Sequence, residues 1–441
     1  MTQDFTRGGL YKTIFHASLP TIIAFIIQST FSLVDAIFVG WISSHALAAV
    51  SVSFPIVFMV IALGVGLGLG STSVVARYVG AKKSRYAKEA AEHSMLLAVA
   101  FGIILMVAGL TLSPSIFKLM GVEESLMSTA LVYLNILLFF APFELSLIVG
   151  NSILRGEGDM RTPMVVMGAS AILNGILDPI FIFTLGWGVE GAAWATVVAR
   201  MIGFTYLAYN LKFGGAKFKL DYVDFRYRFT YFKEVLRIGI PSSMSNIVMS
   251  TGMAVFTAIV AGFGTDALAA FGVGFRLDSL AILPGIGVAT AVISIVGQNI
   301  GAGKADRAMQ TTLKAGAMAS ALMVLFGIPF YLFSTDIVSI FNQEPKVIEY
   351  GASFLRIIPL TYLVVGFNMC IGGAFIGAGK AKLALFNQFS RVMLFSVPLA
   401  YMLSVKIGLE GVWWGITIGS YLSVALSLTL YKYVNWTKST H

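Results

Sequence analysis

Two carboxylic acids lie far inside long apolar segments of this 441-residue chain. Asp35 comes about 15 residues after Pro20 and Asp178 about 16 residues after Thr162, which places each about 22–24 Å along a helix. An ionisable residue in membrane hydrocarbon costs about 2.5–3.5 kcal/mol and usually serves a pathway, a relay or a partner. Two such carboxylates near each other titrate as a coupled pair, and their oxygens can also bind Na⁺. The chemistry they offer is reversible binding of a proton or a cation.

Other polar side chains are expected at a similar depth. Asn174 and Asp178 are four residues apart and therefore share one face of a helix. Thr196 and Tyr133 lie on neighbouring apolar segments that enter from the same side. We expect one buried polar cluster, formed by Asp35, Tyr133, Asn174, Asp178 and Thr196. The alternative is that the two acids are unrelated and face water at helix ends.

The composition identifies the elements that must carry these groups. The chain is 57% hydrophobic and 12% charged, whereas soluble domains carry about 25% charged residues, so a soluble protein is excluded. One Cys excludes a disulfide scaffold and Cys-based metal clusters, and the four His are too scattered to suggest a zinc site. The apolar runs are long and continuous, which favours membrane helices over a β-barrel. We predict an all-α integral membrane protein.

The hydropathy pattern predicts about twelve transmembrane helices. Their approximate ranges are 16–40, 51–78, 92–113, 127–150, 162–185, 190–211, 236–262, 270–298, 312–333, 348–375, 383–404 and 410–433. With the N-terminus inside, about 23 of the Lys and Arg residues fall in cytoplasmic segments and about three outside. We therefore expect a multi-pass protein of the plasma (inner) membrane with both termini in the cytoplasm. The net charge of +9 follows from these inside loops, and we expect no nucleic-acid partner.

The two halves of the chain are repeats of each other. Sliding the sequence by about 221 residues gives about 21 identities in about 72 pairs over positions 16–87. Each repeat contains six spans, so both have the same orientation, and such a duplication is typical of transporters. We predict an N-terminal lobe over residues 1–211, an amphipathic cytoplasmic linker over 212–235 and a C-terminal lobe over 236–441.

The repeat also separates structural positions from candidate functional ones. Residues needed only for the fold are expected in both halves, whereas Asp35 is paired with Phe256 and Asp178 with Leu399. Asn174 is likewise replaced in the second half, by Phe395. Arg200 is another polar position of the first half, and its repeat partner is Ser420. Arg276 and Asp278 are expected to pair with each other or to lie near a helix end. For Glu144, Arg356 and Arg391, which have no obvious partner, the sequence favours local structural pairing.

Several motifs together resemble the multidrug and toxic compound extrusion (MATE) transporters, particularly the DinF-like prokaryotic branch. The resemblance covers nearly the whole chain. The motifs are Pro20, Leu33-Val34-Asp35 ahead of Phe38-Val39-Gly40, Ala46-Leu47-Ala48-Ala49-Val50, Leu154-Arg155-Gly156-Glu157-Gly158-Asp159 and Asn174-Gly175-Ile176-Leu177-Asp178-Pro179.

This resemblance implies a twelve-helix, V-shaped antiporter with two lobes, which exports organic cations and other amphiphiles in exchange for H⁺ or Na⁺. In that branch the acid matching Asp35 is the coupling acid of an N-lobe cavity, and its network partners map to Tyr133, Asn174, Asp178 and Thr196. The family's drug-cavity positions map to Gln28, Met167, Asn151 and Asp35. The implied protein is not an enzyme and needs no cofactor beyond its coupling ion. We expect it to work as a monomer in the lipid bilayer.

The chain departs from the NorM-like pattern of the same family. The C-lobe acids of that pattern would lie in spans seven and ten, which contain no Asp or Glu here. This favours coupling through the N-lobe, with H⁺ ahead of Na⁺. Sodium remains open and would bind at Asp35, Asn174, Asp178 and Thr196.

Three other functions are weighed against this one. A flippase for lipid-linked substrates usually needs cationic residues to hold a pyrophosphate, whereas the cavity residues are mostly acidic or neutral. An intramembrane aspartyl protease is suggested by Gly156-Glu157-Gly158-Asp159, but a tight turn explains that motif and its repeat copy, Gly377-Ala378-Gly379-Lys380. Nothing resembles the selectivity filter of a channel.

Overall fold

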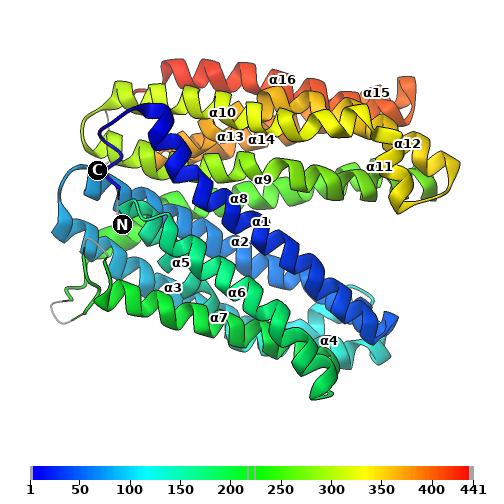
Figure 1. Ribbon diagram of the computed structural model, residues 1–441, viewed down its shortest axis with the longest axis horizontal. Helices are drawn as coiled ribbons and strands as arrows, with labels where there is room; N and C mark the ends of the chain where they lie inside the picture. Colours follow the sequence, from blue (N-terminus) through cyan, green and yellow to red (C-terminus); the bar gives the residue numbers. More distant parts are fainter. Residues whose placement is uncertain (1–2, 216–217, 223–224, 437–441) are drawn as a thin grey trace. The chain divides into compact units, whose positions relative to one another are not determined.

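The computed structural model describes residues 3–215, 218–222 and 225–436, and these residues form helices and connecting segments with no β-strand (Figure 1). The expected linker, 212–235, therefore includes four residues outside the described ones. The helices are α1 (Leu10–Ile42), α2 (Ser44–Gly80), α3 (Ser84–Leu119), α4 (Glu124–Phe139), α5 (Ala141–Glu157), α6 (Arg161–Pro179), η1 (Ile180–Thr184), α7 (Gly188–Phe213), α8 (Phe229–Ala261), α9 (Thr265–Gly301), α10 (Ala305–Leu332), α11 (Ser334–Phe341), α12 (Pro345–Ile357), η2 (Ile358–Thr361), α13 (Tyr362–Gly377), α14 (Ala381–Phe389), η3 (Ser390–Ser396), α15 (Val397–Ile407) and α16 (Leu409–Tyr433).

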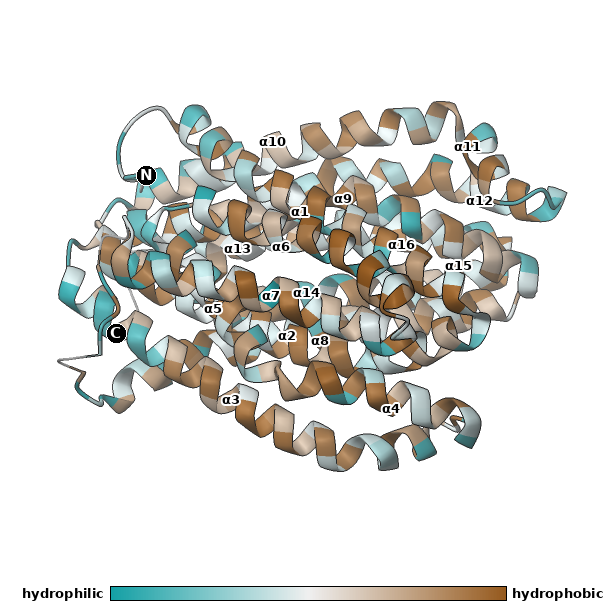
Figure 2. Cartoon of the chain, turned by 60° about the horizontal axis from the view of Figure 1, so that its bottom comes forward, coloured by the Kyte–Doolittle hydropathy of each residue, from teal (hydrophilic) through white to brown (hydrophobic). Residues whose placement is uncertain are grey.

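These elements confirm the predicted all-α membrane architecture. Within the described part of the chain, ten helices are long and apolar enough to cross a membrane, and the pair α4 and α5, bent by 50°, makes an eleventh. The twelfth expected span is α7, which is 26 residues long and carries Glu190 and Arg200. Apolar residues run along the lengths of the helices, and hydrophilic residues gather at helix ends and in loops (Figure 2).

The helices form two compact units, and two helices are divided between them. The first unit comprises the described parts of Met1–Asp4 and Ile23–Ile240, and the second comprises Phe5–Ile22 and the described part of Pro241–His441. Helices α1 and α8 thus each begin in one unit and end in the other. Each has an interior proline close to the change, Pro20 in α1 and Pro241 in α8. An interior proline removes one backbone hydrogen bond and permits a bend, so both changes occur where the helix is weakest.

Within the second unit, the segment before α1 is fastened by side chains of α9 and of the residue that precedes α10. Phe5 is completely buried, and its N–H donates to Gln298 Oε1 at 3.2 Å. Its carbonyl accepts from Asn299 Nδ2 at 3.2 Å, and Lys304 Nζ donates to the Thr6 carbonyl at 2.9 Å. Several backbone groups of an irregular segment are thereby satisfied, as burial requires.

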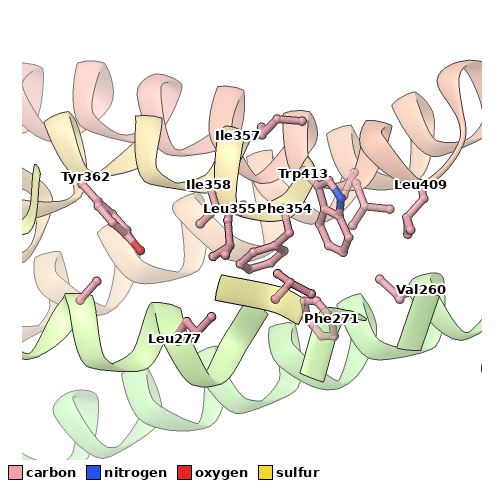
Figure 3. Close-up of a cluster of buried hydrophobic side chains, with 14 of the residues drawn as sticks. Val260, Phe271, Leu277, Phe354, Leu355, Ile357, Ile358, Tyr362, Leu409 and Trp413 are labelled. Atoms are coloured by element: carbon pink, nitrogen blue, oxygen red, sulfur yellow. The ribbon is translucent and has the colours of Figure 1, made fainter. Parts of the chain in front are cut away.

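The core of the second unit is aromatic. Phe271 of α9 stacks on Trp413 of α16 with ring centroids 5.6 Å apart, and Phe354 of α12 meets the same indole edge-on at 4.9 Å (Figure 3). Aromatic pairs prefer these offset and edge-to-face arrangements. Trp413 is completely buried, so this cluster holds α9, α12 and α16 together.

In the first unit, close helix contacts depend on glycine. A Cβ at Gly68 of α2 would collide with Ser152 of α5, and a Cβ at Gly64 would lie 2.9 Å from Ile148. The glycine series in α2 therefore has a packing role, as small residues commonly have between membrane helices.

The connection between α7 and α8 is held against α3 by a buried histidine. His93 Nε2 accepts the Arg228 N–H at 2.9 Å, so the ring hydrogen is on Nδ1, which donates to the Glu89 carbonyl at 2.6 Å. The imidazole also contacts the rings of Phe225 and Phe232, with centroids 4.8 Å and 4.9 Å away.

Candidate functional site

The structure brings Asp35 and Asp178 together within the first unit. Asp178, near the end of α6, is completely buried, and Asp35, on the part of α1 that belongs to this unit, is half-buried. Their carboxyl groups lie within hydrogen-bonding reach of each other. Ionised carboxylates can only accept hydrogen bonds, so a bond between these two requires one shared proton.

Each acid of the pair also keeps an oxygen without a donor. Asp35 Oδ1 and Asp178 Oδ2 are buried and find no hydrogen-bond partner among the described residues. Buried polar atoms in native structures are nearly always satisfied. These two oxygens are therefore available to accept a proton or to ligate a small cation.

Asn174 and Thr196 complete one side of the pair. Asn174 Nδ2 donates to Asp178 Oδ1 at 3.0 Å and to Thr196 Oγ1 at 3.4 Å. The Thr196 hydroxyl donates its own hydrogen to the Ala192 carbonyl at 3.1 Å, so its oxygen is left as an acceptor. This side of the pair is formed by α6 and α7, and its oxygens could also ligate Na⁺.

A glycine lets α1 approach α6 at this point. A Cβ built at Gly175 would collide with the ring of Phe31. Phe31 and Asp35 are four residues apart on α1, and Gly175 and Asp178 are three apart on α6, so both pairs share a helix face. The Phe31–Gly175 contact therefore lies one turn away from the carboxyl pair and sets the separation of the two backbones.

Tyr133 and a charge pair lie in the same region. Tyr133 is buried and packs in a cluster with Val39 and Ala192, close enough to Asp35 and Asp178 to interact electrostatically. Arg200 of α7 forms an ion pair with Glu144 of α5 at 2.5 Å. All five residues of the expected polar cluster are thus in one region of the first unit.

The Glu144–Arg200 pair is the feature of this region that the sequence did not reveal. The two residues are 56 positions apart and lie on helices that are not consecutive. A usable signal was the presence of one acid and one base at similar depth in the same repeat. Arg200 also interacts electrostatically with Asp35 and Tyr133, so the ion pair is joined to the polar cluster.

The three remaining drug-cavity positions are less closely gathered. Asn151 of α5 is 3% exposed, and its Oδ1 has no donor among the described residues. Met167 of α6 is half-buried, with its sulfur 4.0 Å from Arg155 Nη1. Gln28 is exposed on α1, two turns before Asp35.

The second unit has no corresponding acid pair among its described residues. Asp278 of α9 accepts a hydrogen bond from the Tyr362 hydroxyl at 2.7 Å and interacts with Arg391, whereas Arg276 is exposed. Asp278 therefore finds its partners on α13 and η3. Arg356 donates to the Ser334 hydroxyl at 2.9 Å, which is local pairing as expected.

The Gly156–Asp159 motif makes a turn. Gly158 has φ of +99° and ends α5, a conformation that favours glycine. Asp159 accepts from the Arg161 and Thr162 N–H groups at 3.0 and 3.1 Å and from the Thr162 hydroxyl at 2.7 Å. The acid thus caps the start of α6 and takes no part in a catalytic dyad. The described residues also contain no group of His, Cys, Asp or Glu arranged to hold a metal ion.

Comparisons with known proteins agree with this architecture. The family model MatE matches residues 20–180 and 241–402, once in each repeat. The chain is 28% identical over 434 residues to a probable multidrug resistance protein NorM of Thermotoga maritima, covering 97% of this chain and 93% of the relative. It is 27% identical to an FAD transporter of Shewanella oneidensis, covering 91% and 89%.

A solved structure gives the same result in three dimensions. The outward-facing conformation of a multidrug resistance MATE family transporter superposes with a TM-score of 0.93 at 31% identity, covering 98% of both chains. The match supports a twelve-helix transporter fold and excludes an enzyme. With the two copies of the family model, it shows that the chain belongs to the MATE family and is a multidrug efflux transporter of the membrane.

Proposed function

We propose that the protein exports cationic and amphiphilic drugs in exchange for H⁺, with Asp35 as the coupling acid. The observation that carries the proposal is the contact between Asp35 and Asp178, which joins α1 to α6 and leaves two buried oxygens without donors. A proton shared by the pair would hold the helices together. A bound organic cation would compete with it for the same carboxylates.

Coupling then follows from reciprocal binding. If the drug weakens proton binding, the proton must weaken drug binding by the same factor. One unit of pH difference supplies about 1.4 kcal/mol per proton exchanged, and a potential of about 100 mV adds about 2.3 kcal/mol per net charge moved. Sodium is the second candidate ion, because carboxylate, amide and hydroxyl oxygens converge at the same place. We place the protein in the inner membrane as a monomer, with both termini in the cytoplasm.

The test is transport of an ethidium-like dye by protein reconstituted in liposomes, first under a pH gradient and then under a Na⁺ gradient. We expect the wild type to move dye under the pH gradient. We expect Asp35→Asn to abolish that movement and to leave a folded protein. Asp336→Asn, which removes an exposed acid at the start of α11, is the control and should transport normally.

Other outcomes would redirect the assignment. Normal export by folded Asp35→Asn protein would contradict the role given to this acid. Export under the Na⁺ gradient alone would make the cluster a sodium site. The absence of export under either gradient would favour a flippase for lipid-like substrates.

A further inference from the structure

Arg155 is a half-buried cation of the first unit that has no carboxylate partner among the described residues. Its Nη2 donates to the Ser152 hydroxyl at 2.8 Å, and its Nη1 lies 4.0 Å from the weakly accepting sulfur of Met167. A guanidinium has five N–H donors. Among the described residues, no charged side chain interacts with this one.

Two other arginines on the membrane helices have an acidic partner. Arg200 pairs with Glu144, and Arg391 interacts with Asp278. In a low-dielectric setting an unpaired charge is costly, so proteins normally supply a partner or keep the charge for a ligand. Arg155 has the environment of a residue whose partner arrives from outside.

Arg155 does not serve the end of its own helix. The last carbonyls of α5 are already capped, because the Gly158 N–H donates to the Arg155 carbonyl and the Asp159 N–H to the Leu154 carbonyl. The side chain turns back along α5 to Ser152, three residues earlier, as helical side chains do. Its charge therefore lies between α5 and α6.

Asn151 provides a second, independent indication of a ligand. It is four residues before Arg155 and so on the same face of α5. It is 3% exposed, and its Oδ1 has no donor among the described residues. The same place thus combines a guanidinium that lacks an anion with an amide oxygen that lacks a hydrogen-bond donor.

Helix α6 connects this place to the acid pair. Met167, Asn174 and Asp178 are separated by seven and four residues, so they follow one face of the helix. Met167 touches Arg155, and Asn174 donates to Asp178. The eleven residues between Met167 and Asp178 span about 16 Å. This face of α6 therefore has the Arg155 cation of α5 beside one end and the Asp178 carboxyl group at the other.

We propose that Arg155 is the anion-binding end of the substrate site and that the transported amphiphiles include molecules with a carboxylate or phosphate group opposite their cationic group. This inference rests on the proposed function, because it extends the drug site near Asp35. Arg155 binds the acid through charge-assisted hydrogen bonds. Asn151 accepts a donor from the same molecule.

The experiment compares a rhodamine ester with its free acid, which share one cationic ring system and differ in a single carboxylate. Binding to the purified full-length protein in nanodiscs is followed by fluorescence anisotropy. We expect Arg155→Gln to weaken binding of the free acid by about tenfold and to leave binding of the ester unchanged. Arg155→Lys keeps the charge, and its affinity for the free acid should lie between those of the wild type and Arg155→Gln. Arg161→Gln, which removes an exposed cation from the start of α6, should behave as wild type.

The proposal would be overturned if folded Arg155→Gln protein lost affinity equally for the acid and the ester, or lost affinity for neither. Failure of the wild type to export the ester under any gradient would instead count against the proposed function. A lysophosphatidylglycerol competitor separates the two sources of the acid. If the lipid competes with the dye less well in Arg155→Gln than in the wild type, the site also binds lipid phosphate. If only binding of the free-acid dye depends on Arg155, the site binds carboxylate-bearing drugs.

Discussion

At the scale of single residues, the polar region of the first unit consists of two linked parts. Asp35 and Asp178 contact each other, and each has one oxygen without a hydrogen-bond donor among the described residues. Glu144 and Arg200 form an ion pair in the same region. The first part can change its number of bound protons, whereas the second has its charges already matched. Arg200 also interacts electrostatically with Asp35, so the two parts are linked.

Removing one member of the ion pair should cost stability. Glu144→Gln leaves Arg200 with an uncompensated charge, and we expect a loss of about 1–3 kcal/mol for this partly exposed pair. The double variant Glu144→Gln with Arg200→Gln should lose less, because no charge is stranded. Thermal unfolding in detergent measures both. The single variant Arg200→Gln completes the comparison. If the double variant loses as much stability as the two single variants added together, the two side chains contribute nothing as a pair.

At the scale of elements, the site depends on how closely α1 approaches α6. Only the second part of α1 takes part, and many of its side chains are exposed, such as Leu33 at 53% and Ile37 at 50%. A helix with few packing partners can move at modest cost. The Phe31–Gly175 contact is thus one of the few fixed points that keep Asp35 beside Asp178.

Filling the space at Gly175 should separate the acids. A valine there would collide with the Phe31 ring, and we expect Gly175→Val to lose pH-driven dye export. Gly272→Val is the matched control, because a Cβ at Gly272 of α9 meets nothing within 4 Å. Adding Phe31→Ala to Gly175→Val makes room again and should restore part of the export. Full export by Gly175→Val alone would show that close approach is unnecessary.

At the scale of the whole molecule, the sequence could predict the membrane-spanning helices better than it could predict which of them pack against each other. Hydropathy and the internal repeat are enough for the spans, because each span must be apolar by itself. The contact of Asp35 with Asp178 could be anticipated from equal depth. The partners of Glu144 and Asp278 could not, since they depend on which helices face each other. The division of α1 near Pro20 is also invisible to periodicity, because the helix continues through it.

The connection between α7 and α8 is held in part by His93, and the effect of losing this residue can be measured. His93→Leu removes the acceptor of the Arg228 N–H and the ring that packs on Phe225 and Phe232. We expect faster hydrogen–deuterium exchange at the Arg228 amide, by about tenfold, since one buried hydrogen bond and an aromatic contact are lost. His16→Leu, which alters a side chain hydrogen-bonded to the Lys12 carbonyl within its own helix, should leave this amide unchanged. Unaltered protection in His93→Leu would mean that the connection is held elsewhere.

The attachment of Phe5–Ile22 to the second unit has a consequence for synthesis. These residues leave the ribosome before the helices that follow them, and Gln298, Asn299 and Lys304, which fasten them, are made almost three hundred residues later. Throughout most of translation the beginning of α1 is in the bilayer without its final neighbours. This attachment can therefore form only after α9 has been made, and a gene cut at the connection between α7 and α8 would yield two fragments that each lack part of their own unit.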